Sequence, residues 1–188
     1  LLESAGRPEV MADGTPHSAT GLTQITPSAA TELLGMRVDL ARSAELTKRI
    51  ARAAERGRTQ LALRLARERR RVDERFRPDR ALDGPARYLR IATHRFGSEE
   101  LAVVSYHMGM GNLEDVIEAY GRPRPSYAEL YFATTPATHP EAHERLSAFG
   151  DDSSNYFWKL LAARRIMRTW RENPARVAPP RLRPLPEG

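Results

Sequence analysis

The sequence contains no cysteine, which excludes disulfide bonds, cysteine nucleophiles and thiolate zinc sites. It also lacks any apolar run near the roughly 18–20 residues that a membrane-spanning helix needs. Lysine is scarce, because Lys48 and Lys159 are the only lysines among 30 basic residues. Such an arginine bias is typical of a GC-rich genome. With 188 residues, 40% of them hydrophobic, the chain is long enough for one domain with a real core.

The net charge of +6 is unevenly distributed. Residues 37–80 hold 15 Arg and Lys against 7 Asp and Glu, a net of +8, so the rest of the chain sums to −2. Thin apolar stripes on either side of Gly57 predict a helical hairpin here. Two interpretations stay open: a solvated charged face, or a binding surface for a polyanion, for which an anionic cell-wall polymer would qualify as well as nucleic acid.

Helix signals dominate the remainder, and no stretch alternates with period two for long enough to predict a strand. The sequence therefore predicts an all-α fold. Capping residues and apolar spacing predict helices at 27–34, 85–96, 99–108, 112–120, 127–132 and 156–170, the last of them in the core. The Pro- and Arg-rich stretch 172–188 is typical of a tail or linker.

Four short blocks carry the functional signal. They are Glu3-Ser4, then Gly21-Leu-Thr-Gln-Ile25, then Ser105-Tyr106-His-Met-Gly109, then Asp152-Ser-Ser-Asn-Tyr156. In this order the chain resembles the soluble lytic transglycosylase family, whose catalytic domain has the goose-type lysozyme fold. The resemblance covers roughly residues 1–36 and 81–170, which makes 1–171 a lysozyme-like domain and 37–80 an inserted hairpin.

The resemblance implies a function and a set of site residues. Glu3 would be the catalytic acid, and Ser4, Gln24, Ile25, Tyr106, His107 and Tyr156 would contact substrate. The chain departs from the family pattern at Thr23 in place of Met, at His107 in place of Asn, and at Asp152-Ser153 in place of Glu-Thr. The helix expected before Glu3 is almost absent, so the resemblance also predicts an N-terminally trimmed domain.

The implied chemistry needs one carboxyl group. A glycosidic oxygen must be protonated to leave, and an apolar site allows a carboxylic acid to supply that proton near neutral pH. Most glycosidases use a second carboxylate, for which Glu9, Asp13 and Asp152 are weak candidates. In the transglycosylases the muramic acid 6-hydroxyl attacks instead and gives a 1,6-anhydro product. The expected substrate is peptidoglycan in the cell envelope, and no cofactor is expected.

Other readings compete with this one. A lysozyme-type hydrolase and an inactive peptidoglycan-binding relative are the nearest alternatives. An arginine-rich nucleic-acid binder would need aromatic residues among its arginines, and the basic segment has only Phe76. His139 and His143 have the i,i+4 spacing of a metal site but lack a glutamate directly after the first histidine, so no metal is predicted.

Overall fold

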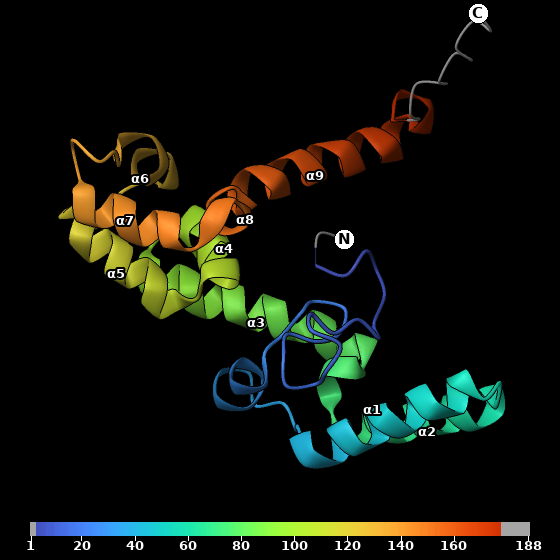
Figure 1. Cartoon of the computed structure of the whole chain (residues 1–188). Helices are drawn as coiled ribbons and strands as arrows, with labels where there is room; N and C mark the ends of the chain where they lie inside the picture. Colours follow the sequence, from blue (N-terminus) through green and yellow to red (C-terminus); the bar gives the residue numbers. More distant parts are fainter. Residues whose placement is uncertain (1–2, 178–188) are drawn as a thin grey trace, which may run out of the picture.

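The computed structural model describes residues 3–177, except for the side chains of Asp151 and Asp152. Helices make up nearly all of its regular structure (Figure 1). They are α1 (Leu40–Glu55), α2 (Thr59–Val72), α3 (Pro78–Phe96), α4 (Glu99–Met108), α5 (Met110–Tyr120), α6 (Tyr127–Ala133), α7 (Pro140–Ala148), α8 (Gly150–Ser154) and α9 (Tyr156–Glu172), with short turns η1 (Ala29–Leu33), η2 (Glu74–Phe76) and η3 (Pro174–Arg176). Over these residues the backbone forms isolated bridges but no strand, which confirms the all-α prediction.

The main core lies among α3, α4, α5, α6 and α7. Helix α4 is buried on most of its surface, as its apolar sequence predicts, and Leu101, Ala102 and Val104 are at most 1% exposed. Ser98 caps α4 by accepting a hydrogen bond from the backbone N–H of Leu101. The predicted capping box of Ser126 and Glu129 begins α6. Local capping signals thus determine where these helices begin, and burial of their apolar faces packs them together.

Helix α3 begins at Pro78, seven residues before the predicted start at Pro85. Pro78 occupies the first turn, where its missing N–H costs no hydrogen bond. Pro85 therefore lies inside the helix, where it leaves the carbonyl of Ala81 without its usual i+4 donor. The predicted end at Gly97 is confirmed, with the glycine in the left-handed conformation at φ 67°.

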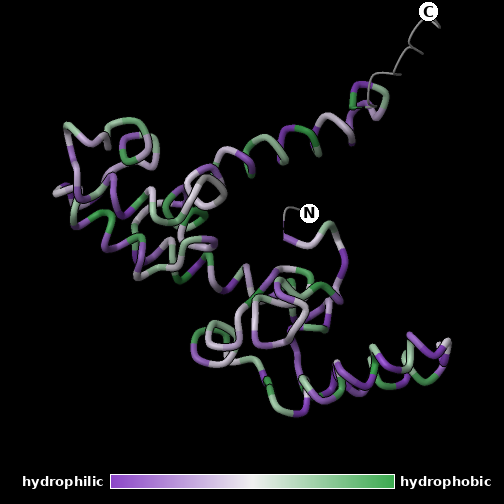
Figure 2. The backbone as a smooth tube through the Cα atoms, viewed as in Figure 1, coloured by the Kyte–Doolittle hydropathy of each residue, from purple (hydrophilic) through white to green (hydrophobic). Residues whose placement is uncertain are grey.

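The predicted hairpin is confirmed by α1 and α2, which pack against each other and turn at Gly57. Leu46, Ala53 and Leu65 form a small apolar cluster between the two helices, separate from the main core. Figure 2 shows the hairpin as a mostly hydrophilic arm that projects from the body. Phe76, the aromatic residue of the basic segment, lies in η2 after the hairpin, with the guanidinium of Arg69 stacked 3.6 Å from its ring centre.

The prediction of a core helix at 156–170 is only partly correct. Tyr156 and Phe157 are buried, but α9 then runs away from the body (Figure 1). Its later apolar side chains are exposed, including Ile166 and Trp170 at 52% each. Arginines surround these residues on the helix, so this part of α9 presents no continuous apolar face to the core. None of the helices within residues 3–177 has the length and apolarity of a membrane crossing.

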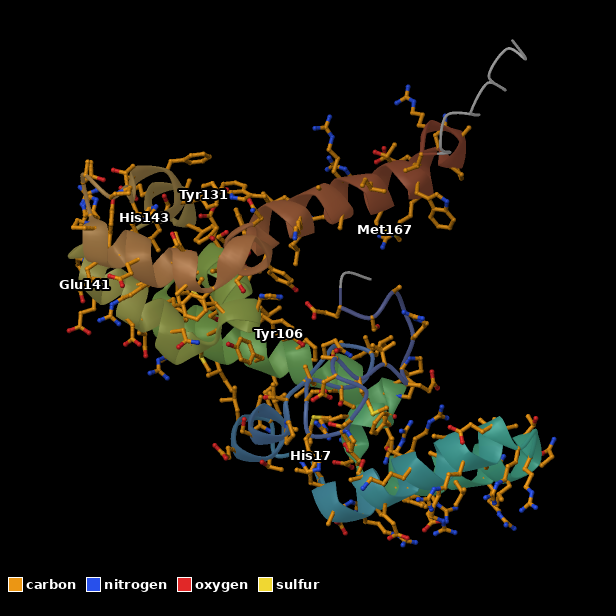
Figure 3. All side chains as sticks on the ribbon, in the orientation of Figure 1. His17, Tyr106, Tyr131, Glu141, His143 and Met167 are labelled. Carbon is orange, nitrogen blue, oxygen red and sulfur yellow. The ribbon has the colours of Figure 1, made fainter. Side chains whose placement is uncertain are left out.

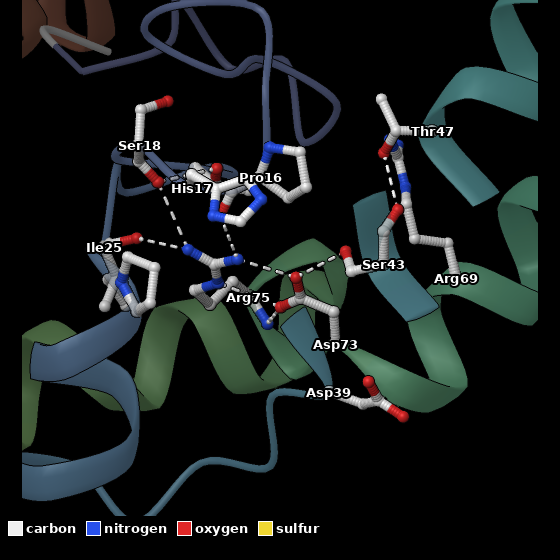
Figure 4. A network of polar contacts seen from close by, with 12 residues as sticks. Pro16, His17, Ser18, Ile25, Asp39, Ser43, Thr47, Arg69, Asp73 and Arg75 are labelled. Atoms are coloured by element: carbon white, nitrogen blue, oxygen red, sulfur yellow. Dashed lines mark hydrogen bonds and ion pairs between the residues drawn. The ribbon is translucent and has the colours of Figure 1, made fainter. Parts of the chain in front are cut away.

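A buried ion pair joins the hairpin to the N-terminal loop that precedes η1 (Figure 4). Asp73 and Arg75 are both fully buried, and Arg75 Nη2 lies 2.7 Å from Asp73 Oδ2. The same guanidinium donates to the carbonyls of Pro16 at 2.7 Å, Ser18 at 3.2 Å and Ile25 at 3.4 Å. Ser43 of α1 donates to Asp73 at 2.8 Å. One arginine thus holds the loop against the base of the hairpin.

Replacing Arg75 with Met is expected to destabilise the protein by about 3–5 kcal/mol, because it leaves the Asp73 carboxylate buried without its partner. It also removes the donors to three loop carbonyls. Urea unfolding, followed by circular dichroism, measures the change. Arg145→Gln, which breaks an exposed ion pair with Glu141 on α7, is the matched control and is expected to change stability little. Equal stabilities for the two variants would contradict this account of the loop.

Candidate active site

Glu3 lies at the meeting point of two hollows in the surface. One, of about 440 Å³, is lined by Glu3, Ala12, Ala19, Gln24, Thr26, Tyr106, His107, Tyr156 and Lys159. The other, of about 180 Å³, is lined by Glu3, Thr23, Pro85, Leu89, Val103, Tyr106, Tyr156 and Leu160. Glu3 is half-buried, and the two hollows share it with Tyr106 and Tyr156. The loop, α4 and the first turns of α9 therefore converge on one carboxyl group.

Tyr156 is the residue that holds Glu3. Its hydroxyl donates a hydrogen bond of 2.6 Å to Glu3 Oε1, between residues 153 positions apart. Burial raises the pKa of the Tyr156 phenol well above its usual range, and the hydrogen bond to the Glu3 carboxylate raises it further. The phenol is therefore a dependable donor at every pH at which the protein is expected to work.

His107 supports Tyr156 from the other side. The two rings are stacked with their centres 4.8 Å apart, and His107 Nδ1 lies 2.9 Å from the hydroxyl of Ser153. His107 is exposed on the wall of the larger hollow. His107, which stands where the family has Asn, thus places an imidazole at the edge of the site, with one ring nitrogen held by Ser153.

Tyr106 faces the cleft from α4 (Figure 3) but does not hydrogen-bond Glu3. Its hydroxyl donates to the carbonyl of Thr23 at 2.7 Å, and its ring packs edge-on against Tyr88 at 5.1 Å. Burial is the main cause of its raised pKa, and the Glu3 charge adds to it. Tyr106 therefore fixes the loop and offers its ring, rather than its hydroxyl, to a ligand.

Gln24 lies on the loop in a left-handed conformation, with φ 51°. Its Nε2 donates to the carbonyls of Gly21 at 2.8 Å and Val10 at 3.1 Å, so both amide protons are used within the loop. Gln24 lines the larger hollow, and its side-chain oxygen makes no hydrogen bond within residues 3–177. Gln24 can both stabilise the loop and accept a hydrogen bond from a ligand.

Ser4 and Ile25 are placed differently from the other predicted contacts. Both are 4% exposed, and neither lines the two hollows around Glu3. The Ser4 hydroxyl donates to the carbonyl of Leu22 at 2.7 Å, and Ile25 belongs to the main core. Their side chains hold the Glu3 segment and the loop in place instead of facing a ligand.

Thr23, where the chain departs from the family pattern, makes a hydrogen bond that accounts for the change. Its hydroxyl donates at 2.9 Å to the carbonyl of Ala81, which is the α3 carbonyl that Pro85 leaves without a donor. Thr23 thus satisfies a polar group that a methionine could not. Because this pairing joins residues 58 positions apart, the sequence alone gave no signal of it.

Neither alternative carboxylate on the loop reaches Glu3. Glu9 pairs with Arg70 at 3.0 Å, and Asp13 accepts a hydrogen bond from the backbone of Thr15 at 2.9 Å. The Asp152 side chain falls outside the described part of the structure. Among described residues, Glu3 is the one carboxylate that lines either hollow. The part of the chain that is described also contains no cluster of three or more metal-ligating side chains.

Lys159 is a cleft residue that the sequence reasoning missed. It lines the larger hollow together with Glu3 and Tyr156. Lys159 and Tyr156 lie three positions apart on α9 and therefore share a helix face. That spacing was visible in the sequence, but only the position of Tyr156 in the structure shows which face of α9 is turned to Glu3.

Comparison with known families gives one match. Residues 50–127 match the family described as "Transglycosylase SLT domain". This match supports an SLT-type transglycosylase domain in the chain. The matched range includes Tyr106 and His107 but not Glu3, Gln24 or Tyr156, and it begins inside α1, within the segment interpreted above as an insertion. No curated protein and no solved structure matches the chain.

The buried tyrosines of this SLT domain predict how its stability depends on pH. Burial raises the pKa of Tyr106, Tyr127 and Tyr156, so the folded protein retains protons that the unfolded chain releases. The free energy of unfolding should therefore fall as pH rises above about 10, the ordinary pKa of tyrosine. Urea unfolding between about pH 8 and pH 11 measures this, and Tyr156→Phe is expected to make the fall shallower. An unchanged slope would place Tyr156 in a more solvated site.

The loop geometry predicts an unequal effect at two glycines. Both have positive φ, 85° at Gly21 and 78° at Gly14, but a Cβ at Gly21 would lie 2.1 Å from the carbonyl oxygen of Arg75, whereas one at Gly14 meets nothing within 4 Å. Gly14→Ala is expected to cost about 1–2 kcal/mol for the backbone alone. Gly21→Ala should cost clearly more, measured by thermal unfolding. Similar costs would show that Arg75 and the loop are not in close contact.

Proposed function

We propose that this SLT domain is a murein lytic transglycosylase that cleaves the β-1,4 bond between MurNAc and GlcNAc with Glu3 as its single acid and base. The observation that supports this most is the contact between Tyr156 and Glu3 at 2.6 Å, in a cleft whose described lining contains no second carboxylate. A single carboxyl group suits an enzyme whose nucleophile belongs to the substrate. With this substrate class, the proposal includes a location in the cell envelope.

The proposed reaction uses Glu3 twice. In the first step the Glu3 carboxylic acid gives its proton to the bridging oxygen, and the bond from that oxygen to the MurNAc anomeric carbon breaks. In the second step the Glu3 carboxylate takes the proton of the MurNAc 6-hydroxyl, whose oxygen bonds to the anomeric carbon. The products are a free GlcNAc 4-hydroxyl and a 1,6-anhydromuramic end, and Glu3 recovers its proton.

The surroundings of Glu3 fit both steps. Leu89, Val103 and Leu160 give the smaller hollow beside the carboxyl group an apolar lining. The Tyr156 hydroxyl, which donates to Glu3, stabilises the carboxylate between the steps. Apolar walls and one donor therefore suit the two protonation states that Glu3 must alternate between.

The remaining cleft residues have binding roles in this proposal. The Gln24 side-chain oxygen accepts from an acetamido N–H, and the Tyr106 and His107 rings pack against sugar faces. Lys159 contributes a positive charge to the same wall, which suits the carboxylate-bearing lactyl and peptide substituents of MurNAc. Ser4 and Ile25 act through the loop, as positioning residues.

A lysozyme-type hydrolase is the second candidate, because the larger hollow of about 440 Å³ is polar enough to admit water beside Glu3. Hydrolysis would need another group to orient that water. The described cleft offers no second carboxylate for this task. The transglycosylase reaction is favoured because it needs no such group.

Digestion of purified sacculi, with mass spectrometry of the released muropeptides, tests the proposal. The unaltered protein should release fragments with 1,6-anhydromuramic ends, and Glu3→Gln should lower the rate by roughly 10²–10⁴-fold, the range for loss of a general acid–base group. The matched control is Glu32→Gln, which removes an exposed glutamate of η1 away from the cleft and should leave the rate unchanged.

Three outcomes would contradict the proposal in different ways. Reducing ends in place of anhydro ends would show a hydrolase. Equal activity of Glu3→Gln and Glu32→Gln would remove Glu3 from the mechanism. Binding to sacculi without release of any fragment, by the unaltered protein, would identify a glycan-binding relative without activity.

A further inference from the structure

The tip of the α1–α2 hairpin carries a small hollow surrounded by arginines. Helix α1 contributes two of them and the turn between the helices contributes the other two; they are Arg49, Arg52, Arg56 and Arg58. The hollow measures about 170 Å³, and its other lining residues, Ala53, Leu61 and Leu65, are apolar. In Figure 1 this end of the hairpin points away from the main body, and Figure 3 shows nitrogen-tipped side chains around the arm.

Among residues 3–177, most of the arginines at the tip have no carboxylate within ion-pair distance. Near the base of the hairpin the ion pairs are close, as in Arg42 with Glu68 at 2.5 Å and Arg70 with Glu9 at 3.0 Å. At the tip only Arg49 has a carboxylate partner, Glu45 at 3.5 Å. Arg52, Arg56 and Arg58 are exposed and have none within 4.0 Å among residues 3–177. Four guanidinium groups around one hollow repel each other unless an anion enters.

Phosphate is the anion that this geometry suits best. Each guanidinium presents a planar fork of N–H donors that matches two oxygens of a phosphate group. Leu61, which is half-buried in the lining of the hollow, can pack against the carbon chain between successive phosphates, whereas Ala53 and Leu65 are buried between the helices. A single phosphate would leave most of the charge unpaired, so a chain with repeated phosphates fits the arginine cluster better.

The tip lacks what two other polyanions would require. Single-stranded nucleic acid binds through stacking on aromatic side chains, and the one aromatic residue of the segment, Phe76, is 1% exposed beneath Arg69. Binding to a bilayer surface would require exposed apolar side chains beside the charges. The one large apolar residue exposed on the described hairpin, Leu63, lies in α2, outside the lining of the hollow. A flexible phosphodiester chain makes neither demand.

We propose that the arginine cluster at the hairpin tip binds a flexible phosphodiester polymer of the cell wall, of the poly(glycerol phosphate) type. The choice of a wall polymer rests on the proposed function, because a cleft that works on glycan strands brings the hairpin among the polymers of the same wall. The hairpin then anchors the protein to the wall while the cleft engages a strand. The tip and the cleft use separate residues.

Equilibrium binding of purified poly(glycerol phosphate), measured by fluorescence anisotropy over a range of salt concentrations, tests this inference. If four arginines each displace one counterion, affinity should fall by roughly 50-fold between about 50 mM and about 200 mM salt, using the slope of about 0.7 per phosphate that holds for flexible strands. The tip variant Arg49→Gln, Arg52→Gln, Arg56→Gln, Arg58→Gln should lose most of this dependence and most of the affinity.

A matched control removes the same charge elsewhere. Arg90→Gln, Arg124→Gln, Arg164→Gln and Arg168→Gln together replace four exposed arginines outside the hairpin, and this variant should bind like the unaltered protein. Thermal unfolding confirms that both variants fold. Equal loss of binding in the two variants would show an effect of net charge alone and would overturn the inference.

Other probes separate the sources of phosphate. Tighter binding to single-stranded or duplex DNA, or to vesicles of phosphatidylglycerol, than to poly(glycerol phosphate) would overturn the assignment to a wall polymer, as would absence of binding to any of them. The Glu3→Gln variant should bind poly(glycerol phosphate) as well as the unaltered protein. Failure of the cleft chemistry and failure of the tip interaction are therefore distinguished.

Discussion

The buried pair of Asp73 and Arg75 is the interaction on which the arrangement of the site depends. A fully buried guanidinium must satisfy all of its donors, and Arg75 does so with one carboxylate and three carbonyls of the N-terminal loop. Within the described residues 3–26, which precede η1, no strand or helix orders the loop. Its shape is therefore set by a residue of the hairpin base, so the hairpin is structurally part of the site and not only an addition to it.

The same loop joins the other parts of the cleft. Ser4 holds Leu22, Tyr106 holds Thr23, and Thr23 in turn holds the α3 carbonyl that Pro85 leaves open. Each contact is a hydrogen bond to a backbone carbonyl, which fixes the main chain without using the groups that face the cleft. Glu3 and the Gln24 oxygen remain available, and Tyr156, from the far end of the chain, completes the site.

The proposed chemistry and the proposed anchor use charged groups in two separate parts of the molecule. One carboxylate in a cleft with apolar walls suits proton transfer, because few competing charges surround it. The arginines at the hairpin tip are separated from it along the arm and surrounded by solvent, where a flexible polymer can reach them. In this proposal the hairpin tip binds a wall polymer, and the cleft cleaves a neighbouring glycan strand.

The sequence by itself determined most of the helices and the residue types of the site, but not the start of α3 and not α7 or α8. Local signals predicted these helices: the caps at Ser98 and Ser126, the helix end at Gly97 and the apolar stripes around Gly57. Each depends on hydrogen bonds or periodicity within a few residues. Only the tertiary structure decided how α3 continues through Pro85, that α9 leaves the core, and that Ser4 and Ile25 face inward. These outcomes depend on partners more than 15 residues away, such as Thr23 for Ala81 and Tyr156 for Glu3, which no local pattern can specify.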